Sequence, residues 1–325
     1  MIRAPHSKTP VALFTYNRPA HAGRALASLA RCHRFDDCQV YLFCDGSKGG
    51  HDQAAVEASR KVVRDWAAQH GAEVIERPDN LGLARSIVAG VTDLCARLGR
   101  VIVLEDDMQV SPDFLDYMIQ ALDRYESEAV VYQISAFMFP AALSNEADAY
   151  FLPLTTTRGW ATWERAWRIF DWQATGARER LADPEIRKRF DLDGNYPYSN
   201  MLEDRLAGKN DSWGILWWWA VFQTGGLVLH PRTSLVWMDG FDGTGTHCGV
   251  GEIEQVSLEL MSRLRLSTPI RFPGRIGMNQ EVLEAIKAYL AGERSMRSGV
   301  AREWFVYRLL KPFAWLGRRR VGGGP

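Results

Sequence analysis

The chain has 325 residues, 46% of them hydrophobic and 24% charged, which is enough apolar material for a core in one large domain or two smaller ones. Lysine plus arginine equals aspartate plus glutamate, so the zero net charge offers no argument for binding to nucleic acid. The five cysteines are scattered without CxxC spacing, which favours reduced thiols in a cytosolic protein over a disulfide framework or a zinc cluster.

Strands and helices alternate over roughly the first 125 residues. The predicted elements are apolar strands at residues 11–14, 40–44, around 74 and at 100–104, and helices beginning near residues 19, 52 and 80. Pro19 supports the first helix start, because proline suits the first turn of a helix. This alternation implies crossover connections and a largely parallel sheet.

The pattern changes after residue 130, where segments become shorter and rich in tryptophan. Nine of the twelve tryptophans lie between residues 160 and 237. Trp160, Trp163 and Trp167 are spaced i, i+3, i+7, which predicts one face of a helix that packs in the core. The three side chains of the run "WWW" at residues 217–219 cannot all point in the same direction, so we expect one of them to face a cleft.

Three consecutive carboxylates, Glu105, Asp106 and Asp107, follow the apolar run "RVIVL" directly. Adjacent carboxylates in a cleft of low dielectric are unfavourable unless a cation or a hydrogen-bonded ligand compensates them. Mg²⁺ and Mn²⁺ prefer such oxygens, often together with substrate phosphates. A solvated acidic turn before a helix is the alternative; it explains Asp113 in "SPD" but not the triplet. The triplet therefore favours a metal–phosphate site.

Two further motifs, "TYNRP" and "CDGS", also follow predicted strands. Ligands of open α/β sheets bind outside the carboxyl ends of the strands, so these motifs and "LEDD" are expected to meet the same ligand. No "GxxxxGK[ST]" and no strand-linked "GxGxxG" is present, which leaves P-loop and dinucleotide-binding interpretations unsupported.

The ordered set "TYNRP", "DGS", "RPDNLGLARS" and "VLEDDMQVSPDF" resembles nucleotide-sugar glycosyltransferases of the GT-A fold, in particular the N-acetylglucosaminyltransferase I type. The stretch "GWATWERAW" resembles one found in related bacterial family 2-like sugar transferases. The resemblance implies a Rossmann-like α/β fold with a mixed, mainly parallel central sheet flanked by helices. It divides the chain into a nucleotide-sugar-binding half (1–128), a tryptophan-rich acceptor-side and catalytic half of the same domain (129–272) and a C-terminal helical, basic-aromatic tail (273–325).

The same resemblance implies roles for single residues. Donor-binding residues would be Thr15, Asn17, Arg18, Asp45, Arg85, Glu105 and Asp106. Asp107 would bind a divalent cation, Mn²⁺ or Mg²⁺, while Asp106 would contact the ribose or share the metal and Glu105 would contact the donor sugar. Asp45 would face the uracil, and Arg18 would approach the nucleotide or its phosphates.

Simpler explanations of three donor residues stay open. Arg18 fits an exposed arginine at a helix start, Asp45 fits an Asp-Gly turn, and Arg85 fits a solvated position on a helix.

The segment "GKNDSWGILWWW" supplies a candidate general base, Asp211. An inverting transferase deprotonates the acceptor hydroxyl as it attacks the anomeric carbon, and a fixed carboxylate suits that step. The resemblance places the base shortly before a tryptophan, here Trp213. A polar turn that caps the next segment is the alternative, and Glu203 and Asp204 are rival bases.

The loop "GFDGTGTHC" combines glycines, which allow close backbone approach, with His247, a candidate ligand of the metal or a phosphate oxygen. Simple hydrogen bonding of His247 is an equal alternative. Trp160 and Trp213 are candidate platforms for an acceptor sugar, because aromatic faces stack on sugar C–H surfaces.

The tail between residues 301 and 320 interleaves aromatic and aliphatic residues with an excess of positive charge. That composition suits peripheral contact with an anionic membrane surface, and a helix packed on the body is the alternative. No apolar h-region follows Met1, and no run approaches the roughly 20 apolar residues that span a bilayer. We therefore expect a cytoplasmic protein, with peripheral contact to the inner face of the membrane through this tail.

The sequence thus predicts a metal-dependent glycosyltransferase that moves a sugar from a nucleotide sugar, with UDP expected, to a glycan or lipid-linked saccharide. We expect inversion and a place in bacterial surface polysaccharide or glycoconjugate synthesis. A nucleotidyltransferase or other metal-dependent phosphoryl-transfer enzyme is one alternative, although the glycine- and lysine-rich loop it needs is missing. A non-catalytic carbohydrate-binding protein is the second, and it would leave "LEDD" without a purpose.

Overall fold

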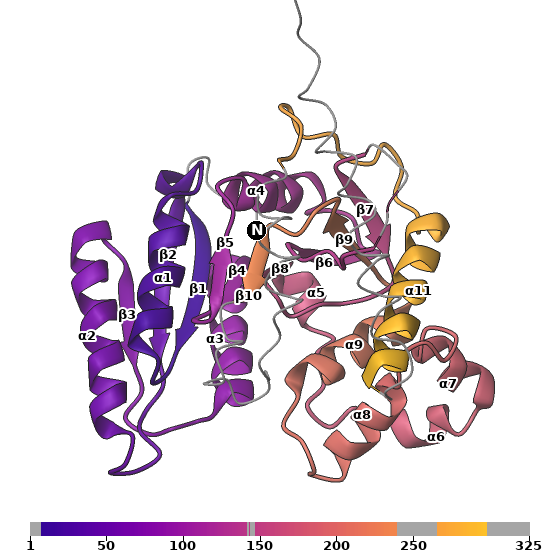
Figure 1. Cartoon of the computed structure of the whole chain (residues 1–325), viewed down its shortest axis with the longest axis horizontal. Coiled ribbons are helices and arrows are strands. Elements are labelled where there is room, and N and C mark those ends of the chain that lie inside the picture. The colour runs from indigo at the N-terminus through magenta and orange to yellow at the C-terminus, as the bar shows by residue number, and fades with distance from the viewer. Residues whose placement is uncertain (1–7, 142, 144–146, 239–264, 298–325) are drawn as a thin grey trace, which may run out of the picture.

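One large sheet forms the centre of the protein (Figure 1). The computed structural model describes residues 8–141, 143, 147–238 and 265–297. In spatial order the eight strands are β3 (Glu73–Glu76), β2 (Cys38–Cys44), β1 (Thr9–Thr15), β4 (Arg100–Glu105), β8 (Trp160–Trp163), β6 (Val131–Ser135), β9 (Leu227–Pro231) and β7 (Ala149–Leu152). A separate antiparallel pair is formed by β5 (Met108–Val110) and β10 (Val236–Met238).

The sheet is mixed and mainly parallel, as predicted. Strands β3, β2, β1 and β4 pair in parallel, and β6 pairs in parallel with β9. Strand β8 runs antiparallel between β4 and β6, and β7 runs antiparallel to β9. Every residue of β1 is buried, as expected for a strand covered by helices on both faces.

Six helices cover the two faces of the sheet. One face carries α1 (Pro19–Ala30), α2 (Gln53–His70) and α4 (Phe114–Arg124), and the other carries α3 (Leu83–Leu98), α5 (Glu164–Trp167) and α9 (Trp213–Thr224). Because side chains alternate along a strand, Val11 and Leu13 of β1 pack with the first group while Ala12 and Phe14 pack with the second. Helix α1 begins at Pro19, as the sequence predicts.

A second core lies at the β7 end of the sheet. It joins β7 to α9 and to four further helices, α6 (Ala177–Leu181), α7 (Pro184–Phe190), α8 (Tyr198–Leu206) and α11 (Gln280–Arg297). In Figure 1 these helices gather on the right-hand side of the molecule. A 3₁₀ turn, η1 (Phe35–Asp37), completes the secondary structure of the described residues. None of the helices in the described ranges has the length and apolarity that crossing a membrane requires.

The tryptophan stripe is not helical, which corrects the sequence-based prediction. Trp160 and Trp163 both lie on β8, and only Trp167 lies on a helix, the single turn of α5. Residues three apart on a strand face opposite sides, so Trp160 packs on the α3 face while the indole N–H of Trp163 donates to the carbonyl of Leu122 at 3.2 Å. The predicted burial is confirmed, but pairing with β4 and β6 outweighs the local helical spacing.

Buried Asp148, just before β7, anchors the returning chain at residues 265–272. Its carboxylate accepts hydrogen bonds from the backbone N–H and the hydroxyl of Ser267, both at 3.1 Å, and from the backbone N–H of Arg271 at 2.8 Å. The Arg271 guanidinium adds an ion pair at 3.5 Å. One side chain thus satisfies several donors of a segment that has little regular structure of its own.

Replacing Asp148 should therefore cost much more stability than replacing an exposed acid. We expect Asp148→Ala to lower the free energy of unfolding by about 2–3 kcal/mol, because it removes a buried carboxylate that accepts from two backbone N–H groups and a hydroxyl. The exposed partner of an i,i+4 ion pair on α2, Asp65, is the matched control, and Asp65→Ala should cost about 0.5 kcal/mol or less. Urea unfolding measures both values, and equal losses would contradict the anchoring role.

Candidate functional site

Three carboxylates gather at the carboxyl end of β4, in the middle of the sheet. Glu105 is the last residue of β4, and Asp106 and Asp107 form the tight turn into β5. Asp106 is only 4% exposed and Asp107 only 7%. The solvated acidic turn that the sequence left open is therefore not what the chain forms.

Strand pairing brings "TYNRP" against these acids. Phe14 of β1 is in register with Glu105 of β4, so the residues that follow the two strands lie side by side. One Arg18 nitrogen, Nη2, contacts Oδ1 of Asp106 at 2.7 Å and Oδ2 of Asp107 at 3.2 Å. The backbone N–H of Tyr16 donates to the other oxygen of Asp106 at 3.2 Å. Arg18 is thus part of the acidic cluster and not an isolated surface arginine.

The triplet fits a divalent cation. The buried Oδ1 of Asp107 finds no hydrogen-bond partner in the described part of the chain. Two arginines, Arg18 and Arg158, act on the three carboxylates, so the cluster keeps excess negative charge when all three acids are ionised. The described residues hold no group of three His, Cys, Asp or Glu side chains arranged as a complete metal site. One or two protein carboxylates completed by substrate phosphates are the usual ligands of Mg²⁺, and Asp107 suits such a partial site.

Burial shifts the protonation of the cluster. Burial and the neighbouring charges of Asp107 and Asp106 raise the pKa of Glu105 to about 8. Burial likewise raises the pKa of Asp106 to about 6, an increase that the Arg18 charge limits. Without a cation the cluster therefore holds a proton at neutral pH, and full ionisation requires an added positive charge.

The predicted donor residue Asp45 has a structural role in the described chain. Its carboxylate accepts hydrogen bonds from the backbone N–H groups of Leu81 at 2.9 Å and Gly82 at 3.0 Å, which fastens the loop before α3 to the end of β2. A side chain at Gly46 would approach the backbone of Asp79 to 2.3 Å, so the "DG" pair also permits this close approach. The contact of Asp45 with a base stays a prediction.

The other predicted donor residues occupy the same edge or its margin. Thr15 ends β1, and its hydroxyl donates to the carbonyl of Phe43 at 3.4 Å. Asn17 is half-buried beside Arg18, whereas Arg85 is exposed on α3. The edge thus gathers Thr15, Asn17 and Arg18 with the triplet and leaves Arg85 facing solvent.

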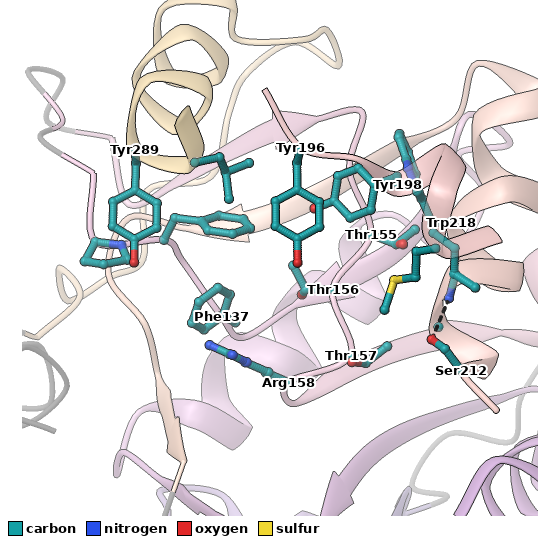
Figure 2. Close-up of a pocket in the computed structure, with 16 residues that line it drawn as sticks. Phe137, Thr155, Thr156, Thr157, Arg158, Tyr196, Tyr198, Ser212, Trp218 and Tyr289 are labelled. Carbon is teal, nitrogen blue, oxygen red and sulfur yellow. Dashed lines mark hydrogen bonds between the residues drawn. The ribbon is translucent and has the colours of Figure 1, made fainter. Parts of the chain in front are cut away.

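A cavity of about 330 Å³ opens on the β6 side of the triplet (Figure 2). Val103 of β4 pairs with Trp160 of antiparallel β8, and Arg158, two residues before this strand, is close enough to Glu105 for its charge to lower the pKa of that acid. The segment before β8 therefore leads from the carboxylates into the cavity wall. Gly159 has φ of 60°, in the left-handed region that glycine adopts without strain, where the chain turns into β8.

The candidate base Asp211 lies just before the start of α9. It is exposed and directly precedes Ser212, which lines the cavity and caps α9 by accepting from the N–H of Ile215 at 3.4 Å. Ser212 therefore forms the capping turn that the sequence analysis left open as an alternative. This turn fixes the backbone next to Asp211. The rival bases are paired: Glu203 with Arg187, and Asp204 with Lys209 at 2.9 Å.

The predicted acceptor platforms are buried. Trp160 is 0% and Trp213 5% exposed, with their ring centroids 5.2 Å apart in the core on the α3 face. In this conformation neither ring offers an open face to a sugar, because neighbouring side chains already cover both.

Other aromatic residues line the cavity in their place. They come from four segments of the chain: Phe137, Phe139, Tyr196, Tyr198, Trp218 and Tyr289. Trp218 is the member of "WWW" that lines the cavity, as expected for one of the three. The motif "NYPYSN" could have indicated Tyr196 and Tyr198 as binding residues. Phe137 and Tyr289 carry no comparable signal in the sequence. The candidate ligand His247 and the tail at residues 301–320 lie outside the described residues.

The shifted pKa of Glu105 predicts how the stability of the metal-free protein depends on pH. The folded protein keeps the proton of Glu105 up to about pH 8, whereas the unfolded chain loses it near 4.5. The contribution of this group is therefore complete below pH 4.5 and is lost as pH rises toward 8. We expect Glu105→Gln to become more stable relative to wild type between pH 5 and pH 8.

Urea unfolding in EDTA at several pH values tests this expectation. Glu179→Gln, at an exposed position of α6, is the control, and its stability should follow that of the wild type. A constant difference between Glu105→Gln and wild type across this range would show that Glu105 is not held protonated.

Comparison with solved structures gives low overall similarity. The chain matches S. aureus TarS with 15% identity and a TM-score of 0.34 over 46% of its own length, which is 25% of the TarS chain. It matches mouse xyloside xylosyltransferase 1 with 13% identity and a TM-score of 0.36, covering 67% of this chain and 81% of that one. A cytidylyltransferase from Leptospira borgpetersenii gives 10% identity and a TM-score of 0.33, with 51% and 64% covered. Scores this low carry no argument about function.

Family comparison is decisive. No curated protein matches the chain. Residues 11–180, just over half of the sequence, match the family described as Glycosyl transferase family 2. The match spans the strands and motifs that build the carboxylate edge and the entry into the cavity. The chain therefore belongs to glycosyl transferase family 2 and is a glycosyltransferase with a GT-A type α/β fold.

Proposed function

We propose that this glycosyltransferase depends on a divalent metal, Mn²⁺ or Mg²⁺, and takes its sugar from a UDP-sugar. The observation that carries the proposal is the buried, unpartnered Oδ1 of Asp107 within the triplet at the carboxyl end of β4. Such an oxygen is costly unless a cation or a hydrogen-bond donor occupies the space in front of it. Family membership also displaces the nucleotidyltransferase and the non-catalytic carbohydrate-binding interpretations.

The donor side of the site is built by three adjacent strands. Asp107 would hold the metal, and Asp106, which is expected to contact the ribose or the metal, would share it. The metal, when bound, supplies positive charge to the leaving diphosphate. The Tyr16 N–H and Arg18 hold Asp106 in place. Arg18 contacts both aspartates, and its guanidinium would turn from them to the phosphates of the nucleotide when the donor binds. Glu105, on which the charge of Arg158 acts, would contact the donor sugar at the boundary with the cavity.

The acceptor side is the cavity, and Asp211 is the proposed base. Asp211 would take the proton from the acceptor hydroxyl as that oxygen attacks the anomeric carbon from the face opposite the diphosphate, which gives inversion. Its place next to Ser212, whose cap fixes the start of α9, supports this role. The acceptor would be a glycan or lipid-linked saccharide in bacterial surface polysaccharide or glycoconjugate synthesis.

Loss of the metal ligand tests the central proposal. We expect wild-type protein to hydrolyse or transfer from a UDP-sugar only with Mn²⁺ or Mg²⁺, and Asp107→Asn to lose at least about a hundredfold, the cost of one misplaced electrostatic contact. Asp93→Asn, at an exposed position paired with Arg97 on α3, is the control. The proposal fails if neither UDP- nor GDP-sugars bind, or if Asp107→Asn keeps full metal dependence.

The base assignment predicts a separation between binding and transfer. Asp211→Asn should bind UDP and Mn²⁺ like the wild type and transfer the sugar at least about a hundredfold more slowly, the usual contribution of a general base. Single-turnover transfer measures the step, and UDP titration measures binding. Unchanged transfer by Asp211→Asn, with a loss in Glu203→Gln or Asp204→Asn, would move the role to α8.

A further inference from the structure

We propose that the cavity beside the carboxylates binds a saccharide ring that carries an anionic group, with the ring against the aromatic walls and the anionic group on Arg158. The inference rests on the proposed function in one respect, that the bound saccharide is the acceptor. It names the chemistry of that acceptor, a sugar with a carboxylate or phosphate substituent.

The walls suit a sugar ring. Figure 2 shows Tyr196 and Tyr289 on one side of the cavity and Phe137 and Arg158 on the other. Aromatic faces pack against the C–H surface of a sugar, and the hydroxyls that also line the cavity supply hydrogen-bond partners for its oxygens. Its volume of about 330 Å³ lies at the small end of ligand pockets, which suits one or two sugar units better than a long chain.

The lining of the cavity carries positive charge and no negative charge. Arg158 is the single charged residue among those that line it, and no carboxylate belongs to the wall. The Arg158 guanidinium lies 4.8 Å from the ring centroid of Phe137. In the described part of the chain it forms neither an ion pair nor a hydrogen bond. Its charge also acts on nearby Glu105 and lowers the pKa of that acid. The half-buried guanidinium keeps its donors available for a carboxylate or phosphate, which its planar fork binds through two hydrogen bonds.

The wall that carries Arg158 is held rigidly. Gln133 of β6 donates to the carbonyl of Thr156 at 2.6 Å, and the hydroxyls of Ser135 and Thr156 lie 2.6 Å apart. Fully buried His230 contacts the carbonyls of Phe137 at 3.1 Å and Leu154 at 2.8 Å, and burial lowers its pKa. A neutral imidazole has one N–H, so His230 donates to one of these two carbonyls and packs against the other. His230 thus holds both segments of this wall beside β9, and the backbone that carries Arg158 needs little reorganisation for binding.

The opposite wall is fastened as well. Leu192 and Asp193, in the connection that leads to Tyr196, have φ values of 50° and 59°, an unfavourable conformation for residues other than glycine. Asp193 forms an ion pair at 2.6 Å with buried Lys287 of α11. The contact holds the connection against the helix that supplies Tyr289, so the tyrosines on this side are placed before any ligand arrives.

Binding of small sugars to the full chain without metal tests the site. The probes are methyl β-glucuronide, glucose 1-phosphate and the neutral methyl β-glucoside, measured by saturation-transfer NMR titration. We expect at least one anionic probe to bind at least about tenfold more tightly than the glucoside, since a charge-assisted bidentate pair exceeds a neutral hydrogen bond. The tighter of the two anionic probes identifies carboxylate or phosphate as the substituent.

Two variants locate the interaction. Arg158→Gln should abolish the preference for the anionic probe, while Arg168→Gln, an equal change of charge at an exposed position of the same segment, should preserve it. Tyr196→Ala should weaken all three probes about tenfold through lost stacking, while the affinity for UDP and Mn²⁺, which shows that the variant is folded, stays unchanged.

Three results would overturn the inference: equal binding of neutral and anionic probes, a preference that survives Arg158→Gln, or no binding of any probe. Loss of UDP affinity in Arg158→Gln with unchanged sugar binding would also overturn it, by assigning Arg158 to the donor diphosphate. Failure here is distinct from failure of the proposed function, which is judged by Asp107-dependent binding of UDP with Mn²⁺.

Discussion

The mutual repulsion of three carboxylates at the end of β4 is the constraint around which the rest of the site is arranged. A buried strand delivers Glu105, Asp106 and Asp107 to the middle of the sheet edge, where water cannot disperse their charge. The protein compensates in two ways: Arg18 lies against both aspartates, and burial keeps a proton on the cluster. Both are partial, since Oδ1 of Asp107 remains without a donor among the described residues. That deficit supports the proposed binding of a divalent cation at this edge.

The antiparallel strand β8 connects this edge to the second half of the molecule. It is inserted between β4 and β6, and the residues just before it, Arg158 among them, line the cavity while the charge of Arg158 acts on Glu105. Two regions of different chemistry therefore lie next to each other, with acids beside β1 and with aromatic rings and one arginine from segments that include α8, α9 and α11. An anionic donor with its cation and a saccharide acceptor suit these two sides.

Much of the donor half could be predicted from sequence, because its signals are local. Apolar runs marked the buried strands, Pro19 marked a helix start, and the acids after "RVIVL" marked a sheet edge. The acceptor half could not be predicted in the same way. Trp160 and Trp163 had helical spacing but joined a strand, because β4 and β6 offered pairing on both sides. Trp160 and Trp213, chosen as sugar platforms, instead pack against each other.

By itself the sequence determined the class of fold, the acidic triplet and the resemblance to sugar transferases, since each depends on short segments whose chemistry is readable in order. Only the tertiary structure decided which residues meet: Arg18 with Asp106 across neighbouring strands, Asp45 with the loop before α3, and the charge of Arg158 with Glu105. It also decided which aromatic rings line a cavity and which are buried in the core. The physical reason is that burial and pairing depend on contacts between segments distant in sequence, and these contacts override local spacing.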